Sequence, residues 1–349
     1  MSSIVSVGTA VPPYLMRQED ACRLAGEHFE GTIENLAKYL QVFKNALVTE
    51  RYFCVEPDWF ASEHSLAAKN RLYLEWAERL SLDAIESCLE GAGVARDEID
   101  YFVFVSSSGI ATPSLDVTII NQLGFRADIR RLPLFGLGCA GGAAGIALCN
   151  SLASTRASAK VLLVAVEINS LTFQPDDLTK SNLVATSLFG DGAAAVLFSA
   201  ESDGLVNILN SVSLLKPDTD HLMGWDFVDT GFRVVFSRAV PQTIMDMMPD
   251  ALGKVIDGRN IGLEDIDAFI FHPGGKRILE AYEKILGRHR EDFASNYGVL
   301  DRYGNMSSAT VLFVLDDVLR KAGRRTGDYG LLAAFGPGFS AEATLVQWT

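Results

Sequence analysis

The chain has 349 residues, more than one hydrophobic core usually supports, so we expect two packed domains or one duplicated domain. Its formal net charge of -14 disfavours binding to nucleic acid, because affinity for phosphate backbones comes largely from Lys and Arg. Hydrophobic residues make up 48% and charged residues 21% of the chain, which excludes an intrinsically disordered protein.

The first residues carry no basic segment, and two prolines interrupt their apolar stretch, so they are not typical of a secretory signal. No later run approaches the ~20 apolar residues that span a bilayer. We therefore expect a soluble, cytoplasmic protein without stable membrane insertion. The five cysteines are scattered and form no CxxC pair, which argues against a disulfide framework or a structural zinc site.

In the first half of the chain, helix and strand patterns alternate. The segment 74–93 has apolar residues at three-to-four spacing and a glycine near its end, which predicts a helix. The segment 97–104, DEIDYFVF, is an acidic turn followed by an apolar run, which predicts a buried strand. A small-residue helix at 141–154 and a strand at 159–167 follow.

The second half repeats this order, with helix, strand, helix and strand patterns at 241–258, 264–271, 306–323 and 329–336. Buried strands that alternate with helices predict parallel sheets covered by helices. We therefore expect an α/β protein of two similar halves, 1–203 and 204–349. Two sheets with helices between and outside them would form a layered αβαβα sandwich, the thiolase-like architecture, although the repeat alone leaves a doubly wound sheet open.

Cys139 lies where an apolar run meets glycines and a small-residue helix, in LPLFGLGCAGGAAG. A cysteine at a helix N-terminus feels the positive end of the helix dipole, which favours the thiolate. Neighbouring glycines permit a sharp turn and close backbone approach. Cys139 is therefore a candidate nucleophile, and a small buried hydrophobic residue is the alternative.

His272 and Asn305 are the other candidate catalytic residues. His272 ends the strand pattern AFIF, and active sites in α/β folds gather at the carboxyl ends of strands. Asn305 begins the second helix of its half, where it could also act only as an N-cap. The repeat gives Cys139 and Asn305 nearly equivalent positions, so the two halves would bring all three residues to one cleft. We expect the other four histidines to be structural.

Two other glycine-rich segments have weaker interpretations. The glycines of 189–198 are compatible with a hairpin or loop, and 335–340 with a tight turn. Neither segment has the spacing of a phosphate-binding loop, and no cluster of His, Cys or carboxylates suggests a metal site. We expect neither a metal nor a bound cofactor.

Seven motifs together resemble the type III polyketide synthases, the chalcone-synthase-like family, and occur in the family's order over nearly the whole chain. They are GTAVPP, GCAGG around Cys139, EINSLTF at 167–173, LFGDGAAAV at 188–196, HPGG at 272–275, GNMSSA at 304–309 and FGPG at 335–338. The resemblance implies a thiolase fold, a homodimer and a catalytic triad of Cys139, His272 and Asn305. It also implies that Phe189 is an apolar gatekeeper beside the nucleophile.

The resemblance implies coenzyme A thioesters as substrates. Cys139 would accept an acyl starter from coenzyme A as a thioester. His272 would pair with the thiolate, and His272 and Asn305 would stabilise the enolate formed when malonyl-CoA loses carbon dioxide. Phe189 would exclude water from the reaction. Repeated extension and cyclisation would follow.

The resemblance also implies residues that bind coenzyme A or line the cavity. Lys38, Lys44 and Arg277 are candidates for the phosphates, although exposed lysines on a helix are the plainer interpretation. Val234 and Trp225 stand where plant enzymes carry a gatekeeper Phe and a glycine, and Thr112 replaces a Met directed at the partner subunit. The remaining candidates for substrate binding are Asn169, Thr172, Gly274, Gly275, Ser307, Gly336, Pro337 and Gly338.

The differences from the plant enzymes at Thr112, Trp225 and Val234 predict a fatty acyl starter and an alkylpyrone, alkylresorcinol or similar product. The nearest alternative is a ketoacyl-acyl-carrier-protein synthase III, which shares the fold and the triad. HPGG and FGPG favour the polyketide synthase. A non-catalytic acyl-CoA-binding scaffold is the other alternative.

Overall fold

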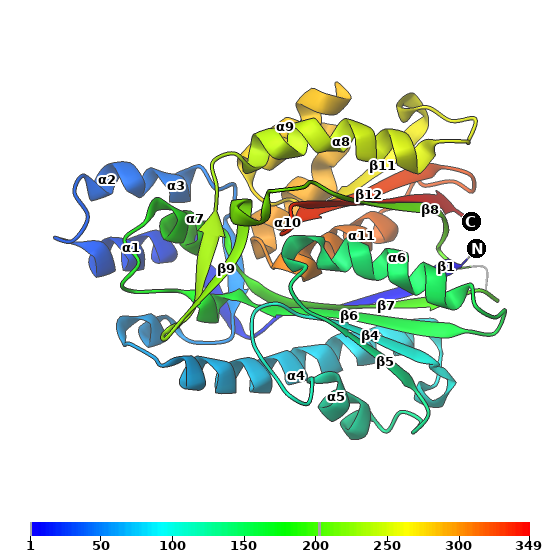
Figure 1. The fold of residues 1–349 in the computed structure, drawn as a ribbon, viewed down its shortest axis with the longest axis horizontal. Helices are drawn as coiled ribbons and strands as arrows, with labels where there is room; N and C mark the ends of the chain where they lie inside the picture. The colour runs from blue at the N-terminus through cyan, green and yellow to red at the C-terminus, as the bar shows by residue number, and fades with distance from the viewer. Residues whose placement is uncertain (1, 202–203) are drawn as a thin grey trace.

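The computed structural model describes residues 2–201 and 204–349 (Figure 1). Nine strands of the described chain form one sheet in the order β11-β12-β13-β8-β1-β7-β6-β4-β5. They are β1 (Ser3–Ala10), β4 (Tyr101–Val105), β5 (Arg130–Leu134), β6 (Lys160–Ile168), β7 (Asp191–Ser199), β8 (Val206–Leu215), β11 (Ile266–Phe271), β12 (Tyr329–Gly336) and β13 (Ser340–Trp348). Only two residue pairs join β1 to β8, so the sheet behaves as two halves.

Helices fill the space between the two sheet halves and cover both outer faces (Figure 1). The central helices are α6 (Gly141–Ala153) and α11 (Thr310–Arg320), and their apolar side chains share one core with strands from both halves. Outside lie α4 (Leu66–Ala92) and α5 (Asp116–Leu123) on one face, and α8 (Val240–Ile256), α9 (Lys276–Leu286) and α10 (Ala294–Tyr303) on the other. The predicted αβαβα layering is confirmed.

The prediction of parallel sheets is wrong for much of this sheet. The pairs β4–β5, β4–β6 and β11–β12 are parallel, but β1, β7, β8 and β13 pair antiparallel with their neighbours. Strand β13 begins at Ser340, directly after β12 ends at Gly336. A connection this short can join only antiparallel strands, and parallel strands need a crossover.

Three element predictions need correction. The helix predicted at 74–93 begins earlier, at Leu66, because the side chain of Ser65 caps it by accepting a hydrogen bond from the backbone N–H of Ala68 at 3.2 Å. Segment 306–323 forms a helix only from Thr310, after a single 3₁₀ turn, η8 (Ser307–Ala309). Segment 189–198 is mainly not a loop but the central strand β7, which is buried on both faces and therefore continuously apolar.

Smaller elements gather at one end of the layers, on the left of Figure 1. They are α1 (Gln18–Phe29), α2 (Leu36–Tyr39), α3 (Gln41–Lys44), α7 (Lys180–Leu188), and the paired strands β2 (Tyr14–Arg17) with β3 (Glu50–Phe53) and β9 (Met223–Val228) with β10 (Gly231–Phe236). Met16, Ala25, Phe43, Phe53 and Leu183 form a separate core here. This end covers the candidate site.

The predicted boundary between the halves falls at residue 203, which lies outside the described residues and stays a prediction. Among residues 2–201 and 204–349, no group of three or more His, Cys, Asp or Glu side chains could hold a metal ion. No helix in these ranges is long and apolar enough to cross a membrane.

Candidate active site

Cys139 lies in a tight turn between β5 and α6. It belongs to a single 3₁₀ turn, η3 (Gly138–Ala140), that runs directly into α6. Gly138 has φ +48°, which favours glycine, and a Cβ there would lie 2.8 Å from Cδ of Pro337. A Cβ on Gly336 would lie 2.5 Å from the carbonyl oxygen of Leu137. The FGPG segment therefore packs against the turn that presents Cys139.

Asn305 reaches the same place from the second half of the chain. Its backbone N–H donates to Leu188 O at 2.7 Å, and its side-chain Oδ1 accepts a hydrogen bond from Ser307 N–H at 2.8 Å. Cys139 Sγ lies 4.0 Å from this Oδ1. Because a backbone N–H can only donate, the bond from Ser307 fixes the amide orientation and leaves Nδ2 free to donate to a ligand.

His272 follows β11, where its backbone N–H donates to Ala333 O at 2.8 Å. It is 3% exposed, and neither ring nitrogen has a hydrogen-bond partner among the described residues. The Tyr282 hydroxyl donates to the carbonyl of His272 at 3.0 Å, and the pKa of Tyr282 is raised by burial and, secondarily, by the nearby Cys139. Tyr282 therefore anchors the backbone of His272.

The electrostatics at Cys139 differ from the sequence prediction that the helix dipole favours a thiolate. Burial raises the pKa of the Cys139 thiol to about 11, and hydrogen bonds with Ser307 and Asn305 offset this only in part. Burial likewise lowers the pKa of His272 to about 3. Desolvation is the largest cause of both shifts and favours the neutral form of each residue, so a neighbouring cation would stabilise a thiolate.

Glu167, at the end of β6, is a buried acid that the sequence interpretation did not single out. Its carboxylate accepts hydrogen bonds from Ser107 N–H at 3.0 Å and from the Ser308 hydroxyl at 2.6 Å. Ser107 in turn accepts a hydrogen bond from Gly138 N–H at 3.3 Å. Burial raises the pKa of Glu167 to about 7. The signal in the sequence was a carboxylate directly after a continuous apolar strand.

Phe189 directly follows α7, next to the backbone of Asn305. The two residues form an isolated parallel bridge, and Gly190 N–H donates to Asn305 O at 3.0 Å. The Phe189 ring meets the Trp225 ring edge to face at 6.0 Å. Trp225 on β9 pairs directly with Val234 on β10. The hairpin thus brings both predicted wall residues to the predicted gatekeeper.

Arg51 fixes the end of α7 from which Phe189 projects, a role that the sequence did not reveal. Its guanidinium donates to the carbonyls of Thr186 and Ser187 at 2.8 Å each and to Gln18 Oε1 at 2.7 Å. The last carbonyls of a helix lack partners within it, and a cation there also complements the helix dipole. Arg51 is fully buried, and burial lowers its pKa to about 9.

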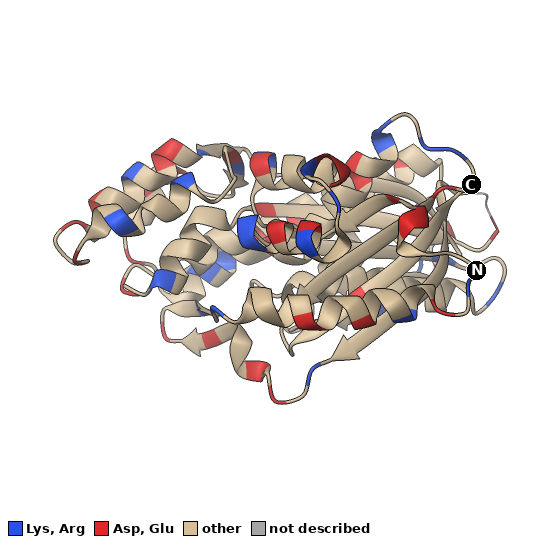
Figure 2. Ribbon diagram, turned by 90° about the horizontal axis from the view of Figure 1, so that it is seen from above, with Lys and Arg blue, Asp and Glu red and all other residues tan. Residues whose placement is uncertain are grey.

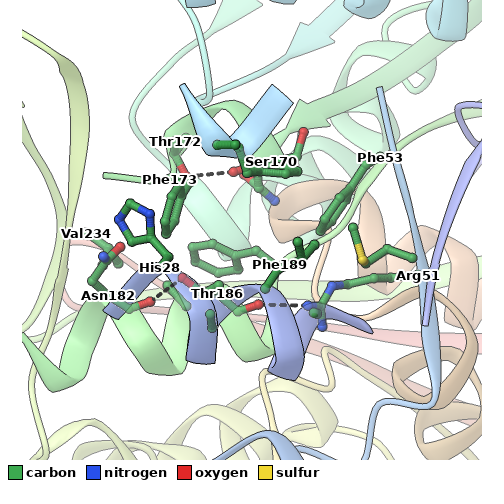
Figure 3. A pocket seen from close by; sticks show the side chains of 18 of the residues that line it. His28, Arg51, Phe53, Ser170, Thr172, Phe173, Asn182, Thr186, Phe189 and Val234 are labelled. Atoms are coloured by element: carbon green, nitrogen blue, oxygen red, sulfur yellow. Dashed lines mark hydrogen bonds between the residues drawn. The ribbon is translucent and has the colours of Figure 1, made fainter. Parts of the chain in front are cut away.

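A cavity of about 430 Å³ lies behind Phe189 (Figure 3). Of the predicted residues, Asn169, Thr172, Phe189 and Val234 line it. Asn169 Nδ2 donates to the carbonyl of Asn305 at 3.3 Å, so the inner wall of the cavity adjoins the candidate catalytic asparagine. The other walls come from α1, β3 and the segment after β6, and most are apolar.

A second pocket of about 590 Å³ contains Lys38, Lys180 and Arg238, with Glu34 as its acidic residue. Figure 2 shows Lys and Arg interspersed with Asp and Glu over the helices at this end. Lys38 thus lines a basic pocket, and sequence reasoning missed the two cations that α7 and the segment after β10 add to it.

Several predicted residues line neither pocket, and Lys44, Arg277, Thr112 and Gly274 are among them. Lys44 and Arg277 are exposed on α3 and α9 and line neither pocket, and Thr112 is exposed in the loop between β4 and α5. Gly274 lies beside the His272 ring, because a Cβ there would come within 3.6 Å of Nε2.

Comparisons with known proteins match both halves of the chain. The family of chalcone and stilbene synthases matches with its N-terminal domain at residues 1–202 and its C-terminal domain at residues 207–348. The chain is 38% identical to a putative chalcone synthase of Bacillus subtilis (strain 168), over 100% of this chain and 99% of the relative. It is 34% identical to 1,3,6,8-tetrahydroxynaphthalene synthase of Streptomyces peucetius subsp. caesius, over 99% of this chain and 93% of the relative.

The fold agrees with these matches. The crystal structure of 1,3,6,8-tetrahydroxynaphthalene synthase from Streptomyces coelicolor A3(2), a bacterial type III polyketide synthase, superposes with a TM-score of 0.95 at 30% identity and covers 99% of both chains. The matches set aside a ketoacyl-acyl-carrier-protein synthase III and a non-catalytic scaffold. The chain belongs to the chalcone and stilbene synthase family, and it is a type III polyketide synthase, an acyltransferase that condenses malonyl-CoA.

Proposed function

We propose that this polyketide synthase loads a fatty acyl starter onto Cys139, extends it with malonyl-CoA and cyclises the chain to an alkylpyrone, alkylresorcinol or similar product. The observation that carries the proposal is the apolar cavity behind Phe189. Its inner wall adjoins Asn305, whose Oδ1 lies 4.0 Å from Cys139 Sγ.

In the loading step, the Cys139 thiol gives its proton to the imidazole of His272, and the thiolate attacks the carbonyl carbon of the acyl-CoA. The sulfur of coenzyme A leaves with its bonding electrons and takes the proton from His272. Because burial disfavours either charge alone, the thiolate forms only as a pair with the imidazolium. A neutral resting pair also protects the thiol from oxidation, which proceeds through the thiolate.

In the extension step, malonyl-CoA loses carbon dioxide, and the electrons of the broken bond form an enolate. The enolate oxygen accepts hydrogen bonds from Asn305 Nδ2 and His272, the two donors that no described residue occupies. The enolate carbon then attacks the thioester on Cys139, and the sulfur leaves with its bonding electrons and takes a proton through His272, which is reprotonated from solvent. Phe189 and Trp225 cover this reaction from the side of the β9–β10 hairpin and limit access of water.

The basic pocket of Lys38, Lys180 and Arg238 is the proposed site for the phosphates of coenzyme A. Cations that converge from three segments can neutralise a phosphate that the chain's net negative charge would otherwise repel. Lys38→Ala should therefore raise KM for malonyl-CoA and leave kcat nearly unchanged. Lys44→Ala is the matched control, because Lys44 is exposed on the neighbouring α3 outside the pocket.

A homodimer also remains part of the proposal. The large apolar side chains of Ile110 and Phe135 are 45% and 56% exposed in loops near Thr112 and Cys139. Contact of these two side chains with a second copy of the chain would remove their apolar area from water. Light scattering during size-exclusion chromatography measures the mass directly, and a single 37.9 kDa species would contradict the dimer.

A second candidate product follows from the relatives. The 34% identity to a tetrahydroxynaphthalene synthase favours a polyhydroxylated aromatic product built without a fatty starter. Mass spectrometry of products from malonyl-CoA, alone and with acyl-CoAs of increasing length, separates the two candidates. Incorporation of the fatty chain supports the proposal, and a product from malonyl-CoA alone that no acyl-CoA displaces supports the second candidate.

The role of Cys139 is tested by Cys139→Ala. The variant should form neither acyl-enzyme nor product, while its melting temperature stays close to that of the unmodified enzyme, because little volume is lost. Intact-protein mass spectrometry after incubation with acyl-CoA measures the acyl-enzyme. If Cys139→Ala were labelled to the level of the unmodified enzyme, Cys139 would not be the nucleophile.

A further inference from the structure

We propose that one face of α1, formed by Ala21, Leu24, Ala25 and His28, ends the acyl cavity and sets the length of the starter that the enzyme accepts. All four residues line the cavity behind Phe189. Their spacing of three, four and seven residues places them on a single face of the helix. This inference rests on the proposed function, because it requires an alkyl starter on Cys139.

The α1 face carries small side chains, which leave space in the cavity. Ala21 and Ala25 are 5% and 4% exposed and lie one turn apart, so the backbone of α1 approaches the cavity with only methyl groups in between. A larger side chain at either position would project into the cavity. The length of the cavity therefore depends on the size of these two side chains.

Aromatic rings form the opposite wall. Phe53 and Phe60 meet edge to face at 5.5 Å, Phe60 and Phe173 at 5.8 Å, and Phe173 and His28 at 5.6 Å. Figure 3 shows Phe53, Phe173 and His28 around the cavity with Phe189 between them. This wall runs from the gatekeeper to the surface of α1.

His28 closes the outer end. Its Nε2 lies 3.0 Å from the carbonyl oxygen of Pro175, so the ring bridges α1 and the segment after β6. His28 itself is exposed, so the cavity ends at the protein surface. Neighbouring Glu27 pairs with Arg23 at 3.0 Å on the solvent side.

The side chains that line the cavity favour an alkyl chain over the growing polyketide, because the aromatic wall is apolar and the terminal nitrogens of Arg51 already donate within the protein. The cation in the wall, Arg51, already donates to two carbonyls of α7 and to Gln18. Keto oxygens placed along the aromatic wall would lose their hydrogen bonds to water, whereas methylene groups gain about 0.8 kcal/mol, or about fourfold, for each one buried. The starter tail therefore occupies this cavity, and the α1 face limits its length.

The experiment measures acyl transfer to Cys139 by intact-protein mass spectrometry, with an equimolar mixture of hexanoyl-, octanoyl-, decanoyl-, lauroyl-, myristoyl- and palmitoyl-CoA and no malonyl-CoA. Ala25→Leu adds three carbons to the wall, so the ratio of the longest accepted starter to hexanoyl should fall by up to about 60-fold at about fourfold for each displaced methylene. Leu24→Ala and His28→Ala should shift the profile towards longer chains. The ratio within one sample is independent of the amount of folded enzyme.

Ala67→Leu, the same substitution on the exposed side of α4, is the control and should leave the profile unchanged. Long chains loaded equally by the unmodified enzyme and by all three α1 variants would overturn the inference and leave the proposed function intact. Failure of the unmodified enzyme to load any of the six starters, with product formed from malonyl-CoA alone, would overturn the fatty starter and the α1 inference together.

Discussion

Glu167→Gln should make the stability of the enzyme less sensitive to pH between about pH 4.5 and about pH 8. Glu167 has no exposed surface, and burial raises its pKa from 4.5 to about 7. A group whose pKa is raised on folding stabilises the fold fully below its unfolded pKa and loses that contribution as the pH rises through the folded value. The unmodified enzyme therefore loses stability over this window.

The size of this effect on the free energy of unfolding follows from the shift in the pKa of Glu167. A rise of about 2.5 pKa units at about 1.4 kcal/mol per unit corresponds to about 3 kcal/mol. Gln resembles the protonated carboxyl, because its carbonyl oxygen can accept from Ser107 N–H while its amide donates to the Ser308 hydroxyl. The free energy of unfolding of the variant, relative to the unmodified enzyme, should thus increase by about 3 kcal/mol across the window.

Urea unfolding at fixed protein concentration and a series of pH values measures this difference. Asp191, whose pKa burial raises to about 6, and His272, whose pKa burial lowers, are present in both proteins and cancel in the comparison. Glu90→Gln on the exposed side of α4 controls for the loss of a surface charge. A difference between Glu167→Gln and the unmodified enzyme that stays constant with pH would refute the reasoning.

Four other substitutions test the site. His272→Ala should reduce both acyl loading and decarboxylation of malonyl-CoA, whereas Asn305→Ala should chiefly reduce decarboxylation; equal loss of loading in both would contradict the separate roles. Val234→Phe should reduce turnover over Michaelis constant for long acyl-CoAs relative to hexanoyl-CoA, because a larger side chain at 234 would fill part of the cavity that Val234 lines; an unchanged ratio would show that Val234 does not limit the acyl chain. Arg51→Met should lower the unfolding free energy by about 2 kcal/mol, since it leaves the Thr186 carbonyl without its donor while Gln18 Nε2 still donates to the Ser187 carbonyl, and urea unfolding against the exposed control Arg79→Met measures this.

Local patterns were sufficient for the elements that alternate most regularly. The strand at 329–336 and the helix at 241–258 occur within two residues of their predicted bounds, because an apolar period of two or of 3.6 residues records which side chains face a core. The direction of β7 and β13 could not be read in the same way. Strands buried on both faces are apolar whether their neighbours run parallel or antiparallel.

The sequence by itself determined the family, the layered fold and the candidate residues Cys139, His272 and Asn305, because short motifs and helix periodicity are local properties of the chain. Only the tertiary structure showed that Arg51 holds the end of α7, that Lys180 and Arg238 join Lys38, and that α1 lines the cavity. It also reversed the expected pKa of Cys139. Those features depend on desolvation and on contacts between segments far apart in the chain, and both arise only when the layers pack.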